Sequence, residues 1–263
     1  MTETTPRGIN PSIPSAARIY DYLLGGKDNF AADREAAERV LRTMPEARLL
    51  ARHNRAFLGR AVRHCVDNGI TQFIDIGAGL PTRDNTHDIA SAVNPDVRVV
   101  YVDNDPIVIS HGRALLEEAG RTAAVPGDVR KPVDLLHEVA RCGLIDFSRP
   151  FAVLLVAVLH FVPDAAGAVE PLKEALPPGG MFVVTHGVRG EQTSREDARA
   201  LQAVYRRSTT PIVERGEEEV LALFDGLRLV PPGLVPLWEW RTPEPPALDE
   251  PPGGIVGGVA RKS

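Results

Sequence analysis

The sequence predicts an α/β fold in which helices cover both faces of a parallel sheet. Three observations lead to this prediction. Short β-rich runs alternate with helical segments between residues 71 and 185, and the first run leads directly into glycines. The run FAVLLVAV at 151–158 is apolar throughout, as expected of a strand with both faces covered. The alternation favours a parallel sheet because parallel neighbours need a long crossover, usually a helix.

About the first quarter of the chain is predicted to be helical. The helices are expected at residues 16–24, 33–42 and 45–67. Ser15 is placed to cap the first of them, and Pro45 occupies a position favoured in a first helical turn. We therefore expect a helical extension over residues 1–68, ahead of a sheet domain over 69–263.

The sheet domain is expected to contain five strands before its tail. They are predicted at residues 72–76, 97–102, 122–125, 151–158 and 181–185. The helices between them are predicted at residues 106–120, 132–141 and 164–176. Asp105 can cap the first of these helices, with Pro106 in its first turn and Gly120 at its end.

The tail after residue 185 breaks this alternation. Thr193 and Glu196 form the pattern of a capping box for a helix reaching Arg207. A helix at 217–224 and extended segments at 227–230, 234–240 and 255–260 are expected to follow. The last segments are joined without a helix, so they suit an antiparallel hairpin that closes the sheet.

Composition narrows the class of function. The chain has 263 residues, a formal net charge of −5 and a pI near 5.8, so it has no basic field for nucleic acid. A small-molecule or protein substrate is expected instead, and of the two we favour a small molecule. No apolar run approaches the roughly 20 residues that span a bilayer, and the polar N-terminus lacks a signal-peptide core. The two cysteines are wrongly spaced for zinc, and no metal site is expected. We expect a cytoplasmic protein.

The segment DIGAGLPT, from Asp75 to Thr82, is the most informative in the chain. A strand that runs into Gly77-Ala78-Gly79 makes a tight turn whose backbone can approach a ligand. Thr82 stands where the dinucleotide fingerprint has its third glycine. The carboxylate of Asp75 would repel a pyrophosphate but would favour a cationic ligand.

Two further acidic positions follow the next two strands. Asp103 ends the second strand, where a carboxylate can accept both hydroxyls of a ribose, and Asn104 beside it can offer an amide to an adenine edge. Asp128-Val129 follows the third strand, where a carboxylate can accept an exocyclic amine. Each acid alone could be a helix cap or a solvated loop residue. Because the ends of parallel strands meet in one crevice, the joint pattern indicates a nucleoside site.

In the order of its motifs the sequence resembles the class I S-adenosylmethionine methyltransferases. These motifs are DIGAGLPT, YVDNDP, GDVR, AVLHFVPD and PPGG before a strand. It is more narrowly similar to a family of such proteins from high-GC bacteria, known mainly as a domain of unknown function. This narrower resemblance rests on SAARIYDYLLGGKDNFAAD at 15–33 and GLVPLWEWRTPE at 233–244. It implies a Rossmann-like, doubly wound sheet of seven strands with the last antiparallel.

The resemblance also implies roles for the residues of the crevice. S-adenosyl-L-methionine would be the cofactor, with Gly77 and Gly79 at its amino-acid end and Asp103 at its ribose. Asn104, Asp128 and Val129 would lie at its adenine. Ala157, at the end of the fourth strand, would face the methyl-bearing centre. The resemblance implies no particular acceptor.

The N-terminal motif and one histidine are the candidates for handling the acceptor. The motif could form a lid over the crevice or a surface helix pair that only packs on the sheet. Tyr20 and Tyr22 could orient a substrate by hydrogen bonding. His160 follows the fourth strand and could act as a general base or serve a structural role.

The predicted reaction is an in-line displacement at the sulfonium methyl group. The protein's task would then be alignment and the exclusion of water. Two alternatives stay open at this stage. The chain could bind the cofactor without catalysis, or it could be a nicotinamide-dependent oxidoreductase on a related fold, against which Asp75, Thr82 and the antiparallel ending argue.

Overall fold

The computed structural model of the chain describes residues 10–82, 84–188, 195–206, 208, 210–243 and 254–263. Its centre is a mixed sheet with the strand order β3-β2-β1-β4-β5-β8-β6, and the short β7 also pairs with β8. The strands β1 to β5 are parallel, whereas β8 runs antiparallel to β5, β6 and β7. The predicted doubly wound sheet with an antiparallel last strand is confirmed, but in the described residues it has eight strands rather than the seven that the resemblance implied, because the short β6 and β7 both pair with β8.

The strands lie close to their predicted positions. Their bounds are β1 Gln72–Ile76, β2 Arg98–Asp103, β3 Thr122–Pro126, β4 Ala152–Val156, β5 Met181–Gly187, β6 Arg228–Leu229, β7 Val235–Pro236 and β8 Ile255–Arg261. The order reverses between β1 and β4, so their carboxyl ends open a crevice at the switch point of the sheet.

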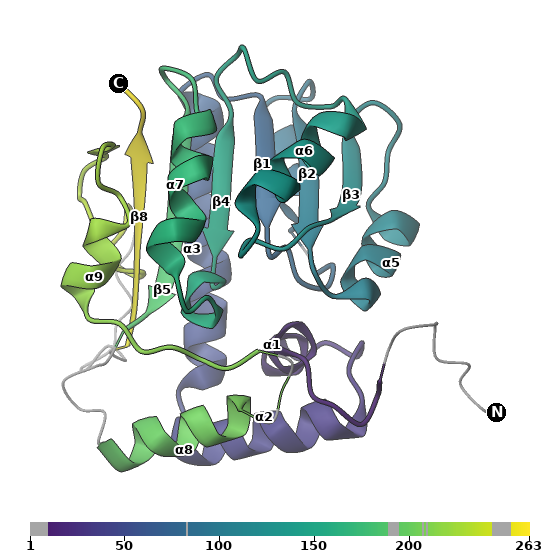
Figure 1. The fold of residues 1–263 in the computed structure, drawn as a ribbon, viewed down its shortest axis with the longest axis vertical. Helices are drawn as coiled ribbons and strands as arrows, with labels where there is room; N and C mark the ends of the chain where they lie inside the picture. Colours follow the sequence, from purple (N-terminus) through teal and green to yellow (C-terminus); the bar gives the residue numbers. More distant parts are fainter. Residues whose placement is uncertain (1–9, 83, 189–194, 207, 209, 244–253) are drawn as a thin grey trace.

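Helices cover both faces of the sheet (Figure 1). Their bounds are α1 Ala16–Leu24, α2 Ala31–Thr43, α3 Ala47–Asp67, α4 Thr86–Ser91, α5 Pro106–Leu115, α6 Pro132–Cys142, α7 Ala165–Ala175, α8 Arg195–Tyr205 and α9 Glu217–Ala222, with a 3-10 turn at Leu159–Phe161. In Figure 1, α6 and α7 lie in front of the sheet and α3 behind it, while α1, α2 and α8 lie beyond the ends toward which β2, β3 and β4 point.

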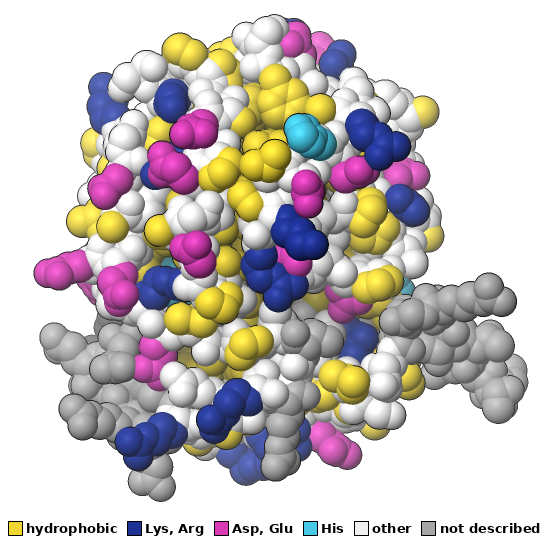
Figure 2. Space-filling view, viewed as in Figure 1, with side chains coloured by type: hydrophobic (Ala, Val, Ile, Leu, Met, Phe, Trp, Pro, Cys, Tyr) yellow, Lys and Arg dark blue, Asp and Glu magenta, His cyan; other side chains and the backbone are white. Residues whose placement is uncertain are grey.

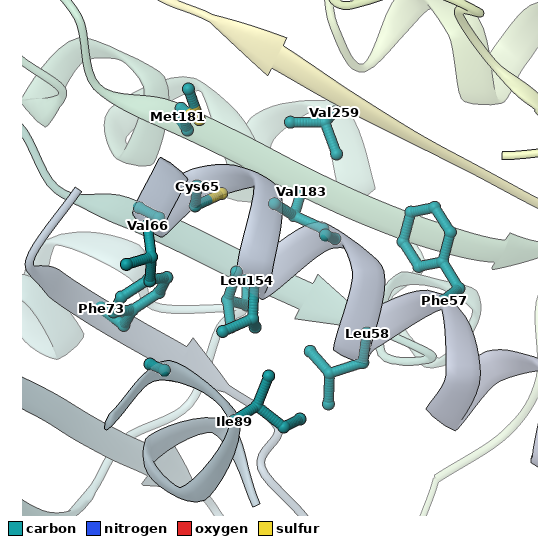
Figure 3. Close-up of a cluster of buried hydrophobic side chains, with 14 of the residues drawn as sticks. Phe57, Leu58, Cys65, Val66, Phe73, Ile89, Leu154, Met181, Val183 and Val259 are labelled. Carbon is teal, nitrogen blue, oxygen red and sulfur yellow. The ribbon is translucent and has the colours of Figure 1, made fainter. Parts of the chain in front are cut away.

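The alternation of side chains along each strand builds two cores. Phe73 of β1 and Leu154 of β4 face α3, where they pack with Leu58 and Cys65 (Figure 3). The neighbouring residue Ile74 faces the opposite side, with the core that α6 and α7 cover. Because successive strand side chains point to opposite faces, the fully apolar strands bury both sides of the sheet.

A separate small core joins the N-terminal helices to the tail. Ile19 of α1, Val40 of α2 and Ala51 of α3 pack with Val204 and Tyr205 of α8. The second half of α3 belongs instead to the sheet core. The first turns of α3 therefore connect the sheet to a helical layer, formed by α1, α2 and α8, that lies beyond the carboxyl ends of the parallel strands (Figure 1).

Several predicted element bounds were wrong. The third helix begins at Ala47 rather than Pro45, and α5 ends at Leu115, before Gly120. Ser15 precedes α1 but makes no side-chain cap, because its hydroxyl bonds Asp105. The predicted Thr193–Glu196 capping box lies outside the described residues.

The predicted strand at 234–240 is mostly a turn, and Arg60 explains why. Only Val235–Pro236 is extended. The guanidinium of Arg60 donates to the carbonyls of Leu237 at 2.5 Å and Trp240 at 2.7 Å, which holds this segment in turns. Trp240 is thereby buried completely against α3, with its ring edge on Phe57.

Candidate functional site

A cavity of about 320 Å³ opens at the switch point of the sheet, a typical volume for a small-molecule site. Nearly all of the site residues predicted from the sequence line it. They are Tyr20, Asp75, Gly77, Ala78, Gly79, Asp103, Asn104, Asp128, Val129, Ala157 and His160. Tyr22 does not line it: its hydroxyl donates to Glu38 on the surface at 2.7 Å. The ends of the five parallel strands and the helical layer thus share one cavity.

The glycine turn after β1 is shaped by backbone contacts. Gly77 and Gly79 both have φ near +68°, a region that residues with a side chain rarely adopt. A Cβ on Gly77 would overlap the side chain of Val158, whereas a Cβ on Gly79 would meet no atom within 4 Å. The turn therefore needs glycine at both positions, and the space beside Gly79 is open to a ligand.

Asp103 links the glycine turn to the end of β2. One of its carboxylate oxygens accepts from the backbone N–H of Gly79 at 3.0 Å and the other from that of Asp105 at 2.9 Å. Burial raises the pKa of this carboxyl to about 6, against the lowering effect of these hydrogen bonds. Each oxygen keeps a lone pair for a further donor. The group fits the two hydroxyls of a ribose.

Asp128 lies at the third strand end with a partner of its own. Arg130 forms a bidentate contact with its carboxylate, at 2.8 Å from Nε and 2.6 Å from Nη2. This bond to Arg130 lowers the pKa of Asp128. Val129 is half-buried and packs on the core, while Asn104 is exposed at the rim. These groups leave an apolar wall beside polar edges, as an adenine ring would need.

Asp75 is buried at the glycine turn and is held by a helix that the sequence analysis missed. Thr86, in the first turn of α4, donates to its carboxylate at 2.7 Å. Burial raises the pKa of Asp75. The signal for α4 was the pair Asn85 and Asp88, which forms a capping box. The acidic group beside the turn suits a cationic ligand rather than a phosphate.

A chain of hydrogen bonds connects the end of β4 to the N-terminal helices. The backbone N–H of Ala157 donates to the Thr185 hydroxyl at 2.8 Å, and this hydroxyl donates to Oδ1 of Asn54 at 2.7 Å. Nδ2 of Asn54 donates to the Tyr20 hydroxyl at 2.8 Å, which in turn donates to the carbonyl of Ala51 at 3.1 Å. Ala157 has φ +59°, a strained value for alanine. This series of hydrogen bonds holds the strained residue in the lining of the cavity.

Asn54 and Thr185 were not predicted from the sequence as residues of the site. The available signal was a polar side chain within the apolar stripe of α3 and another at the end of the apolar strand MFVVT. Both are buried, with exposures of 2% and 0%. A buried polar side chain needs a hydrogen-bond partner. That these two side chains are partners of each other can be recognised only once the fold is known.

His160 reaches the cavity from the 3-10 turn after β4. Its Nδ1 lies 3.5 Å from the backbone N–H of Gly187, and its ring packs edge-on against Phe161. Burial first, then the nearby His186 and Arg215, lowers its pKa to about 3. The imidazole is therefore neutral at physiological pH. If Nδ1 accepts from Gly187, the proton of the neutral ring is on Nε2.

The N-terminal motif, residues 15–33, makes hydrogen bonds within itself and to the residues that follow β2. Arg18 and Asp33 form a buried ion pair at 2.8 Å. Asp33 also accepts from the backbone N–H of Ser15 at 2.9 Å. The hydroxyl of Ser15 donates to Asp105 at 2.7 Å, two residues beyond Asp103. The start of α1 is thereby fastened beside the expected ribose position.

Among the described residues, no group of three or more His, Cys, Asp or Glu side chains could hold a metal ion. No helix in the described part of the chain is long and apolar enough to cross a membrane.

The fold and the cavity together define a class of protein. A Rossmann-like sheet with an antiparallel last strand, an acidic glycine turn and a buried carboxylate at the end of the second strand is the arrangement of an S-adenosylmethionine-dependent methyltransferase. The donor and acceptor groups at Asp75, Gly79 and Asp103 fit that cofactor.

Comparison with known proteins identifies the family. Residues 2–263 match the S-adenosyl methyltransferase family, and the chain belongs to it. A Thermobifida fusca protein assigned as a methyltransferase is 40% identical, with 99% of each chain covered and a TM-score of 0.90. A DUF574 family protein from Streptomyces avermitilis is 37% identical over 95% of this chain and 98% of the other, with a TM-score of 0.87. No match was found among curated protein sequences. The chain is an S-adenosylmethionine-dependent methyltransferase, and its acceptor is the open question.

Proposed function

We propose that the chain methylates a small, mostly apolar acceptor that binds in the deep part of the cavity. One observation carries this proposal: the cavity that contains Asp103 and the glycine turn continues between the N-terminal helices and α8. Its walls there include Leu23, Met44, Leu201 and Ile212. Apolar walls with few polar groups suit a compact organic molecule.

A nucleic acid is a poor alternative acceptor. The net charge of the chain is −5. Over the upper part of the face shown in Figure 2, basic and acidic side chains are interspersed rather than gathered by sign. A nucleic-acid site would need a basic stripe to neutralise phosphates.

In this proposal each group of predicted residues binds a different part of the cofactor. Asp103 accepts its ribose hydroxyls. The amino-acid end is lined by Asp75, Gly77, Ala78 and Gly79, the adenine by Asn104, Asp128 and Val129, and the methyl-bearing centre by Ala157. When bound, the cofactor supplies a methyl group on an already activated sulfonium. The chain's own residues align the acceptor for in-line displacement and exclude water.

We assign His160 a hydrogen-bonding role toward the acceptor rather than that of a general base. A pKa of about 3 leaves its imidazole neutral but only weakly basic. Tyr20 also lines the cavity, but its hydroxyl donates its proton to the carbonyl of Ala51, so Tyr20 serves to position Asn54. Tyr22 has no part in the proposal because it lies outside the cavity lining.

The helical extension, residues 1–68, is proposed to act as a lid over the sheet domain, residues 69–263. The hydrogen bonds from Ser15 to Asp105 and between Asn54 and Thr185 support this role.

A lid fastened by Ser15 should slow cofactor release. Ser15→Ala should speed the dissociation of S-adenosylhomocysteine several-fold in stopped-flow measurements, while the exposed Ser12→Ala should not. Equal dissociation rates for Ser15→Ala and wild type would contradict the lid.

The acceptor class is tested by methyl transfer from labelled S-adenosylmethionine into a bacterial metabolite extract. We expect label in a product that partitions into organic solvent, and its absence with Asp103→Asn. Label confined to protein or nucleic acid would contradict a small-molecule acceptor. Cofactor binding without label in any fraction would contradict catalysis and favour a binding protein.

A cytoplasmic, bacterial setting is also part of the proposal. It is supported by the metabolite-sized cavity and by the bacterial sources of both relatives. Fractionation of a bacterium that expresses the chain at its natural level would test the location.

A further inference from the structure

Tyr205 is a polar residue of the cavity that the proposed mechanism does not use. It ends α8 and lines the cavity, with 8% of its surface exposed. Its hydroxyl forms no hydrogen bond with any residue in the described part of the chain. A buried tyrosine hydroxyl normally finds a partner, so this one is available to a ligand.

The other tyrosine of the cavity is engaged. The Tyr20 hydroxyl donates its proton to the Ala51 carbonyl and accepts from Asn54. A phenol has only one proton to donate. Of the two, Tyr205 is therefore the one that can donate to a bound molecule.

The surroundings of Tyr205 make such a hydrogen bond selective. Its ring packs on Phe161, with ring centroids 5.4 Å apart, and Leu201 lies one helical turn before it on α8. Burial raises the pKa of Tyr205 to about 12, so the hydroxyl stays protonated at physiological pH. A hydrogen bond between such walls is stronger than in water, and leaving the donor unpaired costs free energy.

We propose that Tyr205 donates a hydrogen bond to an oxygen or ring nitrogen of an otherwise apolar, uncharged acceptor molecule, and that it selects for this atom. The inference rests on the proposed function, since it assumes that the acceptor occupies this cavity. An analogue that lacks the accepting atom would leave the buried hydroxyl unpaired. A binding site rejects an analogue more strongly through such a lost hydrogen bond than through a small change in apolar contact.

Quinoline and naphthalene are suitable probes because they have nearly the same shape, while only quinoline has a ring nitrogen that accepts a hydrogen bond. Their affinities are measured by ligand-observed NMR on the full chain saturated with S-adenosylhomocysteine. The quantity of interest is the ratio of the quinoline affinity to the naphthalene affinity. Tyr205→Phe should lower this ratio by about five- to tenfold, the usual value of one hydrogen bond. Its naphthalene affinity should stay at the wild-type value, which reports an intact cavity.

Tyr22→Phe is the matched control, because it removes the same atom outside the cavity. It should leave the ratio unchanged. Equal ratios in wild type and Tyr205→Phe, with both probes bound, would overturn this inference and leave the proposed function standing. If neither probe binds wild type, the apolar acceptor cavity itself is refuted, and the inference fails with it.

Discussion

Cofactor binding should depend on pH through Asp103. The carboxyl is 8% exposed, and burial raises its pKa to about 6. In the proposed cofactor site the ionised form would accept two ribose hydroxyls with charge assistance. Affinity should therefore fall as the pH drops through 6 and level off above 7. The α-carboxylate of the cofactor titrates below this window and its ammonium group above it, so neither produces the step.

The size of this pH-dependent change in cofactor affinity follows from the pKa of Asp103. With a pKa of about 6, roughly one molecule in eleven carries the ionised carboxylate at pH 5 and about ten in eleven at pH 7. The apparent association constant scales with this fraction. Affinity for S-adenosylhomocysteine should thus fall about tenfold between pH 7 and pH 5, or about 1.4 kcal/mol. Since binding favours the ionised form, about half a proton should be released per cofactor bound at pH 6.

Isothermal titration calorimetry between pH 5 and 8 measures both quantities when it is repeated in buffers of different ionisation enthalpy. Asp103→Asn should bind more weakly at pH 7 and lose the step. Asp128→Asn is the matched control: Arg130 lowers the pKa of Asp128, which is ionised throughout this range, so its replacement should keep the step. A flat wild-type affinity between pH 5 and 7, or wild-type affinity in Asp103→Asn, would refute the ribose assignment.

Three further predictions concern the cavity walls. Gly77→Ala should lower the melting temperature far more than Gly79→Ala, because both alanines are strained by about 1 kcal/mol but only the first also overlaps a valine; equal losses would contradict this packing. The ring resonances of His160 should not titrate in NMR spectra between pH 8 and 5, since burial lowers its pKa to about 3, and a midpoint near 6.5 would contradict that burial. Asn54→Leu should reduce the free energy of unfolding in urea by about 1–3 kcal/mol, because the Thr185 hydroxyl loses its acceptor; an unchanged value would show that this hydrogen bond contributes little.

The part of the cavity that we propose for the cofactor could be predicted from the sequence because its signals are local. Gly77 and Gly79 stand directly after a strand, and Asp103 ends the next one. Once the strands are taken as parallel, their carboxyl ends must meet at one edge, so short segments suffice to bring these residues together. The helix α4 was not predicted because it is short. Thr86–Ser91 shows no helical period in its sequence, and its capping box was the only signal for it.

The part of the cavity that we propose for the acceptor was decided by tertiary structure. Asn54 and Thr185 are 131 residues apart, and nothing local to either residue shows that their side chains meet. Tyr20 and Tyr22 are two residues apart on one helix, so they point to different sides, and only the docking of α1 determines that Tyr20 faces the cavity. Tyr205 enters the cavity because α8 packs on the N-terminal helices. Strand ends are brought together by backbone pairing with a regular geometry, whereas helices dock through side-chain packing that depends on the whole fold.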